Sequence, residues 1–227
     1  MKSKARNSLS AVVGGLFLML GSSAFADELN DMVEASRTTF NNFMSDTSMK
    51  WAQDNMEKAQ GLIIVPKYTK AGFIVGGAGG DGVMLARSDD GTWSGPAFYQ
   101  LTAASVGLQA GIDVAEVLMV VNSKKGMEAL LGGGMKLGAD VSVTAGPVGA
   151  GTSAATADVL AYSKSKGLFV GIAFDGSNIQ PSEDKNSAYY GEQVTPADIL
   201  IDRKVSNPAA KDLLKDVAFA EELEVQQ

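Results

Sequence analysis

The sequence contains no cysteine and no histidine among its 227 residues. Without cysteine the chain forms no disulfide, and it has no thiol nucleophile and no thiolate metal ligand. Without histidine it lacks the commonest general base and the commonest metal ligand of proteins. These absences exclude most familiar hydrolase and zinc chemistry. We therefore predict a protein that is not an enzyme, with no catalytic residue, no cofactor and no metal site.

Positive charge is also scarce, because 19 lysine and arginine residues stand against 26 aspartate and glutamate residues. Three of these positive charges lie in MKSKAR at the start, followed by a thirteen-residue apolar run, Leu9 to Gly21, and by Ala24-Phe25-Ala26. This order is typical of a secretory signal, and the run is shorter than the roughly 20 residues that span a membrane. We expect a signal peptide over residues 1–26, cleaved after Ala26, and an exported, periplasmic, soluble protein; the alternative is an uncleaved anchor helix.

Cleavage would leave 201 residues and change the formal net charge from −7 to −10. So acidic a chain does not bind nucleic acid through bulk electrostatics, and its attraction to an anionic membrane needs a local basic patch. The segment VPKYTK offers such a patch in Lys67 and Lys70, on either side of Tyr68. We expect these three residues to form a small basic and aromatic loop between two strands that contacts a phosphate or lipid headgroup. The alternative is a plain solvated hairpin loop.

The spacing of apolar residues predicts helices at both ends of the chain and strands between them. Apolar residues recur every three or four positions from Glu28 to Met44 and again over 48–60, as in amphipathic helices. A period of two or a continuous apolar run then marks candidate strands at 62–66, 71–76, 82–88, 105–113, 116–122, 136–145, 156–163 and 167–174, and we expect a sheet of about seven strands. A turn is expected at 88–91, and a short helix at 124–132 with Asn122 or Ser123 as its cap. Further helices are expected after Pro181, one of them with Thr195 as N-cap, Pro196 in its first turn and Asp198 at its third position.

Glycine is concentrated in the middle of the chain, where 18 of the 26 glycines lie between Gly72 and Gly151. Within strands glycine marks bends, bulges and close backbone approach. We therefore predict an α+β fold with a glycine-rich, strongly curved antiparallel sheet, barrel-like or sandwich-like, flanked by N-terminal and C-terminal helices. Residues 27–227 are expected to form a single domain, with helices over 28–60, a β core over 61–176 and a helical part over 181–221.

The stretch GGAGGDG, residues 76–82, matches the G-x-G-x-x-G pattern of dinucleotide-binding loops through Gly77, Gly79 and Gly82. Such a loop must open a helix whose N-terminus holds the pyrophosphate. Here a strand-like VMLAR and a turn at 90–91 follow, and no acid lies about twenty residues further on, in FYQLTAASVGL. We expect no nucleotide site: residues 76–82 should connect two antiparallel strands or bulge within them, and no helix should begin there.

Two further patterns are typical of catalysis but are weak signals in this sequence. The Ser-x-x-Lys pattern of serine–lysine nucleophiles occurs at Ser163–Lys166 and at Ser182–Lys185, with no apolar pocket evident to lower a lysine pKa. Six carboxylates near strand ends could form a calcium site or an acid–base pair, although no D-x-D-x-D-G spacing is present. They are Asp81, Asp113, Glu116, Asp140, Asp158 and Asp175.

An ordered series of motifs over about residues 57–180 resembles the SYLF domain. The series reads KAQGLIIVP, KAGFIVGGAGGDGVMLAR, DGTWSGPAFYQLTAASVGLQAGID, EVLMVVNS, GADVSVTAGPVG and AYSKSKGLFVGIAFDG. The resemblance implies this fold and a lipid-binding or membrane-proximal role, and some eukaryotic members regulate actin. Lipid binding there is associated with a basic, amphipathic N-terminal helix, whereas DELNDMVEASRTTFNNFMSD in this chain is acidic.

We therefore hypothesise an exported, non-catalytic binding module whose partner is a lipid, a membrane surface or a membrane-proximal partner in the cell envelope. One alternative is a structural or stress-related envelope module that recognises a protein. Another is an enzyme that uses a Ser–Lys or carboxylate pair. No actin or nucleic acid is expected as a partner.

Overall fold

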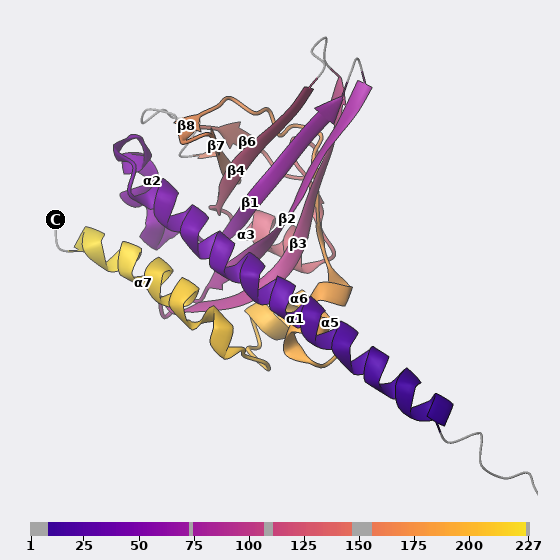
Figure 1. Ribbon diagram of the computed structural model, residues 1–227. Helices are drawn as coiled ribbons and strands as arrows, with labels where there is room; N and C mark the ends of the chain where they lie inside the picture. The colour runs from indigo at the N-terminus through magenta and orange to yellow at the C-terminus, as the bar shows by residue number, and fades with distance from the viewer. Residues whose placement is uncertain (1–8, 73–74, 107–110, 147–155, 226–227) are drawn as a thin grey trace, which may run out of the picture.

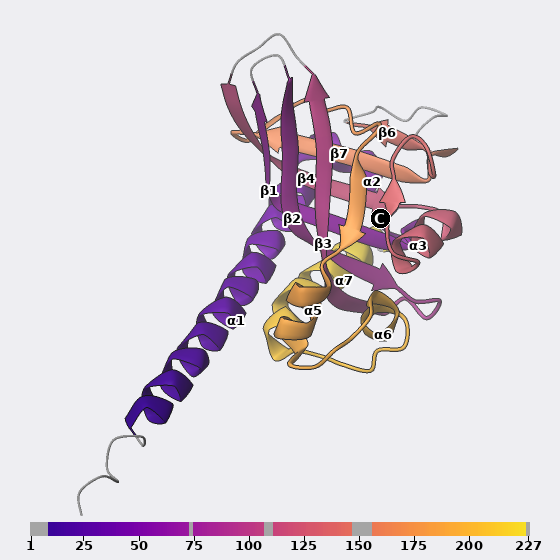
Figure 2. The ribbon, with the colours of Figure 1, turned by 90° about the vertical axis from the view of Figure 1, so that its right-hand side faces the viewer.

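The computed structural model describes residues 9–72, 75–106, 111–146 and 156–225, and Figure 1 shows the arrangement of their helices and strands. The described part of the chain begins with the long helix α1 (Leu9–Met44), whose N-terminal part extends away from the sheet (Figures 1 and 2). Three short helical turns follow it: η1 (Thr47–Met49), α2 (Lys50–Gln53) and η2 (Met56–Lys58). None of the described helices is both long enough and apolar enough to cross a membrane.

Four long consecutive strands form the centre of one curled sheet. They are β1 (Gly61–Gly72), β2 (Val75–Arg87), β3 (Trp93–Val106) and β4 (Gly111–Val121). The shorter strands are β5 (Met135–Lys136), β6 (Val143–Ala145), β7 (Val159–Ser165), β8 (Leu168–Phe169) and β9 (Asn178–Pro181). Among the described residues the sheet order is β5-β9-β3-β2-β1-β4-β7-β6, with β8 paired to β7. Every pair of these strands is antiparallel except β6 with β7.

Helices pack on both faces of the sheet because its strands carry apolar side chains on both. On one face, here called the outer face, α1 and α7 (Lys211–Val225) pack against the sheet, and residues such as Phe40, Ile64 and Leu118 form one core. On the opposite, inner face, Ile63, Val65 and Met119 belong to a second core. This second core also takes in residues of α3 (Lys124–Leu131) and α6 (Pro196–Leu200). The helix α5 (Glu183–Tyr190) and the turn η3 (Pro208–Ala210) complete the C-terminal part.

The ends of β1–β4 extend beyond the helices as a four-stranded projection (Figures 1 and 2). The strand register aligns them in rows, such as Ala71, Gly77, Ala104 and Ile112. We call this part the sheet end and define it as residues 69–72, 75–79, 102–106 and 111–114. On the other side of β4, β7 pairs only with Glu116–Val121, so no described strand pairs with Gly111–Ala115 on that side.

The predicted α+β class with a curved, glycine-rich sheet and helices at both ends is confirmed. The predicted turn at 88–91 is present, since the Gly91 N–H donates to the Ser88 carbonyl. The helix at 124–132 and its cap at Ser123 are also confirmed. So is the Thr195 capping box that begins α6.

Four element predictions were wrong. The helix expected at 48–60 is broken into three short pieces, although Met49, Ala52 and Met56 are buried as its pattern required. Residues 62–66 and 71–76 are not separate strands around a loop, because β1 runs unbroken from Gly61 to Gly72. The strand expected at 136–145 is interrupted, since Gly138 has a φ of 78° and Asp140 accepts a hydrogen bond from the Lys136 N–H. Of 167–174 only β8 is a strand, and β9 lies beyond the expected end of the β core at 176.

Candidate functional site

The glycine motif GGAGGDG lies inside strand β2 and pairs with β1 and β3 on both sides. No helix begins there, so the expectation against a nucleotide loop is confirmed. The expectation of a connection or bulge at 76–82 was wrong, because the extra residue of the β-bulge lies opposite, on β1 between Val65 and Tyr68.

Close backbone packing explains Gly76, Gly80 and Gly82 of this motif, and a Cβ at Gly76 would lie 2.3 Å from the Ala71 carbonyl oxygen. A Cβ at Gly80 would lie 2.3 Å from the Lys67 carbonyl oxygen, and a Cβ at Gly82 would lie 2.3 Å from that of Ile64. Both distances are far below any normal contact, so the bulged β1 can approach β2 only where β2 has no side chain. Gly77 differs, because its nearest neighbour would be 4.0 Å away. Close backbone packing therefore accounts for Gly82 of the G-x-G-x-x-G match but not for Gly77.

The two Ser-x-x-Lys patterns do not form catalytic pairs. The Ser163 hydroxyl donates to the Val170 carbonyl and is buried, whereas Lys166 is exposed in the turn between β7 and β8. Lys185 pairs instead with Asp81, the acid of the glycine motif, at 2.6 Å. The Ser163 contact is local to the turn after β7, whereas the Lys185–Asp81 pair joins the C-terminal part of the chain to β2.

The six carboxylates are dispersed over the sheet. Glu116 accepts from the Thr39 hydroxyl and the Asn42 amide, and Asp158 accepts from the Ser142 N–H and hydroxyl. Asp175 lies against Gly138. No group of three or more acidic residues among the described part of the chain is placed to hold a metal ion.

The predicted headgroup residues Lys67, Tyr68 and Lys70 lie in β1 rather than in a loop, and they do not form one patch. Lys67 and Lys70 are exposed, whereas Tyr68 is buried against Phe174, with ring centroids 5.8 Å apart. Burial also raises the pKa of the Tyr68 hydroxyl. Lys70 and Tyr68 lie on the inner face, because they share rows with Asp113 and Ala115 of β4. Lys67 lies in the bulge opposite Glu116, which contacts Thr39 of α1, and therefore on the outer face. The two lysines therefore lie on opposite faces of the sheet.

Apolar side chains at the sheet end are exposed. Ile112 is 74% exposed and Val114 is 44% exposed, both on the outer face of β4. The surrounding rows hold small residues such as Ala71, Gly77 and Ala104. In the sequence, the stretches 71–80 and 101–112 that contain these strand ends carry no charged residue, although the chain has 45. An uncharged surface of this kind is unusual at the edge of an acidic protein.

Two hollows flank the free edge of β4. The outer hollow has a volume of about 480 Å³ and is lined by Pro66, Ile112, Asp113, Val114, Ala115, Glu116, Lys164, Ser165, Lys166 and Gly167. The inner hollow has a volume of about 260 Å³ and is lined by Tyr68, Lys70, Asp113, Val114, Ala115, Ser165, Val170, Gly171 and Ile172. The hydroxyl of Ser165 donates to the Val114 carbonyl between them, at 2.8 Å.

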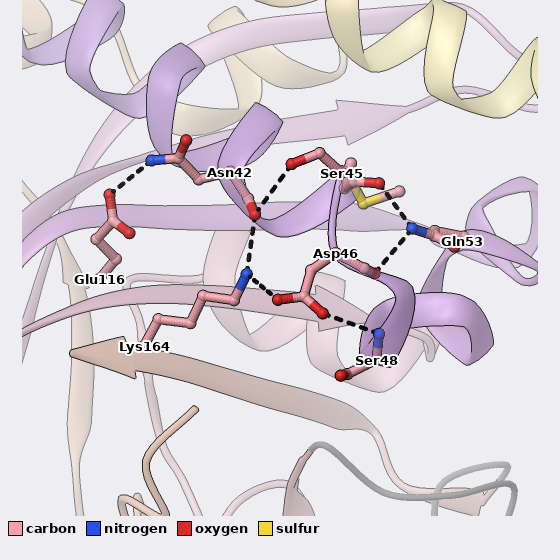
Figure 3. A network of polar contacts seen from close by, with 8 residues as sticks. Asn42, Ser45, Asp46, Ser48, Gln53, Glu116 and Lys164 are labelled. Atoms are coloured by element: carbon pink, nitrogen blue, oxygen red, sulfur yellow. Dashed lines mark hydrogen bonds and ion pairs between the residues drawn. The ribbon is translucent and has the colours of Figure 1, made fainter. Parts of the chain in front are cut away.

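A buried lysine of β7, which was not among the predicted site residues, connects the end of α1 to the sheet beside the outer hollow (Figure 3). Lys164 is 4% exposed, and its ammonium lies 2.8 Å from the Asp46 carboxylate and donates to the Asn42 carbonyl at 2.9 Å. It also lies 5.0 Å above the ring of Phe43 and 4.7 Å above that of Phe169. The hydrogen bond from Lys164 is the main cause that lowers the pKa of Asp46, followed by that from the Ser48 N–H.

The sequence did contain a signal for this lysine. Leu160 and Tyr162 alternate in β7 and are both buried in the outer core, so the next position of the same face, Lys164, is expected to be buried too. A buried ammonium needs partners. The end of α1 supplies the Asn42 carbonyl, where a positive charge is favourable, and Asp46 just beyond the helix supplies the carboxylate.

A family model described as "Ysc84: Las17-binding protein actin regulator" matches residues 102–219 of the chain. The chain is similar to Protein YSC84 of Saccharomyces cerevisiae, with 39% identity over 168 residues. It is also similar to LAS seventeen-binding protein 3 of the same yeast, with 37% identity over 169 residues, and to SH3 domain-containing YSC84-like protein 1 of Bos taurus, with 34% over 177.

These matches cover different shares of the proteins compared. They include 70%, 71% and 74% of this chain, but only 36%, 36% and 51% of the yeast and bovine proteins in the same order. The chain therefore spans about a third to a half of the length of the curated relatives that it matches.

Proposed function

Because the chain belongs to the Ysc84 family, whose common unit is the SYLF domain, we propose that it is a non-catalytic module that binds a lipid membrane surface through the sheet end. The observation that carries this proposal is the exposure of Ile112 within the uncharged rows at the end of four paired strands, with Val114 exposed two residues further along the same face. Transfer of such side chains from water to an apolar medium is favourable, by about 1.5–3 kcal/mol for an isoleucine that becomes fully buried.

The positions of Lys67 and Lys70 also support binding to a membrane through the sheet end. Lys67 and Lys70 follow the uncharged rows toward the body of the protein, one on each face of the sheet. If the sheet end enters the interfacial region of a bilayer, both ammonium groups reach the level of the lipid phosphates. The backbone of the inserted strands is largely paired within the sheet, which reduces the cost of moving it out of water.

We further propose that the module acts outside the cytoplasm, in the cell envelope, after cleavage of residues 1–26. The basic start, the short apolar run and the Ala24-Phe25-Ala26 site support this location. The first buried residue of the described core is Leu29, so cleavage after Ala26 would remove no described core side chain. Mass spectrometry of the protein purified from a Gram-negative envelope fraction tests this, because the expected polypeptide begins at Asp27.

Vesicle flotation tests the membrane proposal. A chain that begins at Asp27 should float with vesicles of mixed zwitterionic and anionic lipids, and Ile112→Asp should weaken its binding about ten-fold or more. Ile201→Asp is the matched control, since Ile201 is 53% exposed but lies at the end of α6, on the body of the protein (Figure 2). Absence of flotation by the unaltered chain, or equal losses in the two variants, would contradict the proposal.

The absence of cysteine permits a direct measurement of orientation. An environment-sensitive fluorophore on Ile112→Cys should shift its emission to the blue when vesicles are added, whereas the same label on Ile201→Cys should not. A blue shift at residue 201 alone would place a different surface at the membrane.

A second candidate is recognition of an envelope protein, favoured by the relatives whose printed names refer to binding of another protein. Purified vesicles alone separate the two candidates, because a protein-recognition module would not float with them. Pull-down from an envelope extract would then recover its partner. Outside the cytoplasm the module would not meet actin, so actin binding by the purified chain would contradict the proposed location and role together.

A further inference from the structure

We propose that the inner hollow binds a zwitterionic phosphate ester with a primary ammonium group, namely the phosphoethanolamine headgroup of a membrane lipid. This inference rests on the proposed membrane binding and names the lipid class that the sheet end selects. Its basis is a pair of opposite charges in one small hollow. Lys70 and Asp113 both line the hollow of about 260 Å³, and they are register partners across β1 and β4.

These two charges are available to a ligand. Both side chains are exposed, and no ion pair joins Lys70 or Asp113 to another side chain in the described part of the chain. The Cα atoms of opposed residues in an antiparallel pair are about 4.5–5.5 Å apart, so one small zwitterion can reach both. The ammonium of Lys70 would bind the phosphate, and the carboxylate of Asp113 would accept hydrogen bonds from the ligand's ammonium.

A third polar group strengthens the preference for a primary amine. The Ser165 hydroxyl uses its hydrogen to donate to the Val114 carbonyl, so its oxygen is left to accept from a ligand that reaches the hollow. Ethanolamine has three N–H donors for the Asp113 and Ser165 oxygens. Choline has none, and a glycerol headgroup carries no positive charge for Asp113. The hollow is therefore complementary to ethanolamine rather than to either of these headgroups.

The position of the charges fits a headgroup rather than an acyl chain. Lys70 and Asp113 form the first charged row below the uncharged rows of Ala71 with Ile112 and of Gly72 with Gly111. Each row adds about 3.4 Å along the strand. When Ile112 lies among the first acyl carbons, the Lys70–Asp113 row lies about one residue higher, at the lipid phosphates.

The test exchanges phosphatidylcholine for phosphatidylethanolamine in vesicles that hold a fixed fraction of phosphatidylglycerol. The unaltered chain should bind the ethanolamine vesicles about three- to ten-fold more tightly, as expected for two exposed charge contacts. Lys70→Met and Asp113→Asn should each reduce this ratio to about one. Lys67→Met is the matched control: it removes the same charge from the same strand on the outer face, so it should weaken binding to both vesicles and keep the ratio.

The outcomes separate this inference from the proposed function. Flotation with no ethanolamine preference, or a preference that Lys70→Met and Asp113→Asn retain, would overturn the headgroup site and leave membrane binding intact. Absence of flotation with every vesicle would overturn both. Competition with soluble headgroups is the last test of the site. Glycerophosphoethanolamine at millimolar concentration should displace the protein from the vesicles, and equal displacement by glycerophosphocholine would count against the site.

Discussion

The two ends of the same four strands differ in what covers them. In the body, Leu62, Ile63 and Ile64 of β1 are at most 1% exposed, because helices and loops pack on both faces of the sheet. At the sheet end the pairing of β1–β4 continues, yet Ile112 is 74% exposed. The backbone pattern is the same in both regions, so side-chain burial alone separates them. Stability is therefore expected to reside in the body, which leaves the sheet end free for binding.

The largest expected contrast is between two isoleucines. Ile64→Ala should lower the free energy of unfolding by about 2–5 kcal/mol, because it removes a fully buried side chain and leaves a cavity. Ile112→Ala should change it by no more than about 0.5 kcal/mol. Urea unfolding of both variants measures the difference, and a comparable loss in Ile112→Ala would mean that the sheet end contributes to the core.

Two glycines of the same motif should respond with opposite signs. Gly82→Ala should destabilise the protein by about 1–3 kcal/mol, since its Cβ would lie 2.3 Å from the Ile64 carbonyl oxygen. Gly77→Ala, at the sheet end, should be neutral or stabilising by about 0.4–1 kcal/mol, because there is space for the methyl group and the unfolded chain loses freedom. Thermal unfolding checks both signs. A strongly destabilised Gly77→Ala would point to a constraint at the sheet end that these contacts do not explain.

The smallest effect is a dependence of stability on pH, located in the body. The pKa of Asp46 is lowered in the folded protein, chiefly by the hydrogen bond from Lys164, so its contribution to stability is present above the ordinary aspartate pKa of about 3.9. That contribution is lost as the pH falls through the folded-state pKa. Denaturant midpoints measured from about pH 6 to pH 2 should fall less steeply in Asp46→Asn than in the unaltered chain. Asp31→Asn, an exposed change elsewhere on α1, is the control and should keep the original slope.

Much of the fold could be predicted from local patterns. The periodicity of α1, the Ser123 and Thr195 caps and the turn at Ser88–Gly91 follow from short-range chemistry, and the structure has each of them. The motif series that resembles the SYLF domain was also sufficient to identify the family, which the comparisons confirm.

Features that depend on contacts between distant residues could not be predicted in the same way. The Lys67–Tyr68–Lys70 segment reads as a polar loop, but its pairing with β2 and β4 makes it part of a strand and buries Tyr68. The ion pair between Lys164 and Asp46 joins residues 118 positions apart, and neither residue alone indicates the other. Likewise, the exposure of Ile112 depends on where β7 stops pairing with β4.

The extra residue in β1 reverses which face of the sheet odd-numbered and even-numbered side chains occupy in the rest of the strand. In an uninterrupted strand, residues 65, 67 and 69 would share one face, and Lys70 would point outward with Ile64. Because β1 gains one residue between Val65 and Tyr68, odd and even positions exchange faces at that point. Deletion of Pro66 or Lys67 would remove the bulge and leave one residue opposite Glu116, while Tyr68 and Lys70 would keep their partners Ala115 and Asp113 on the inner face. The bulge therefore lets β1 hold one more residue than β4 and still place Lys70, rather than Lys67, beside the inner hollow.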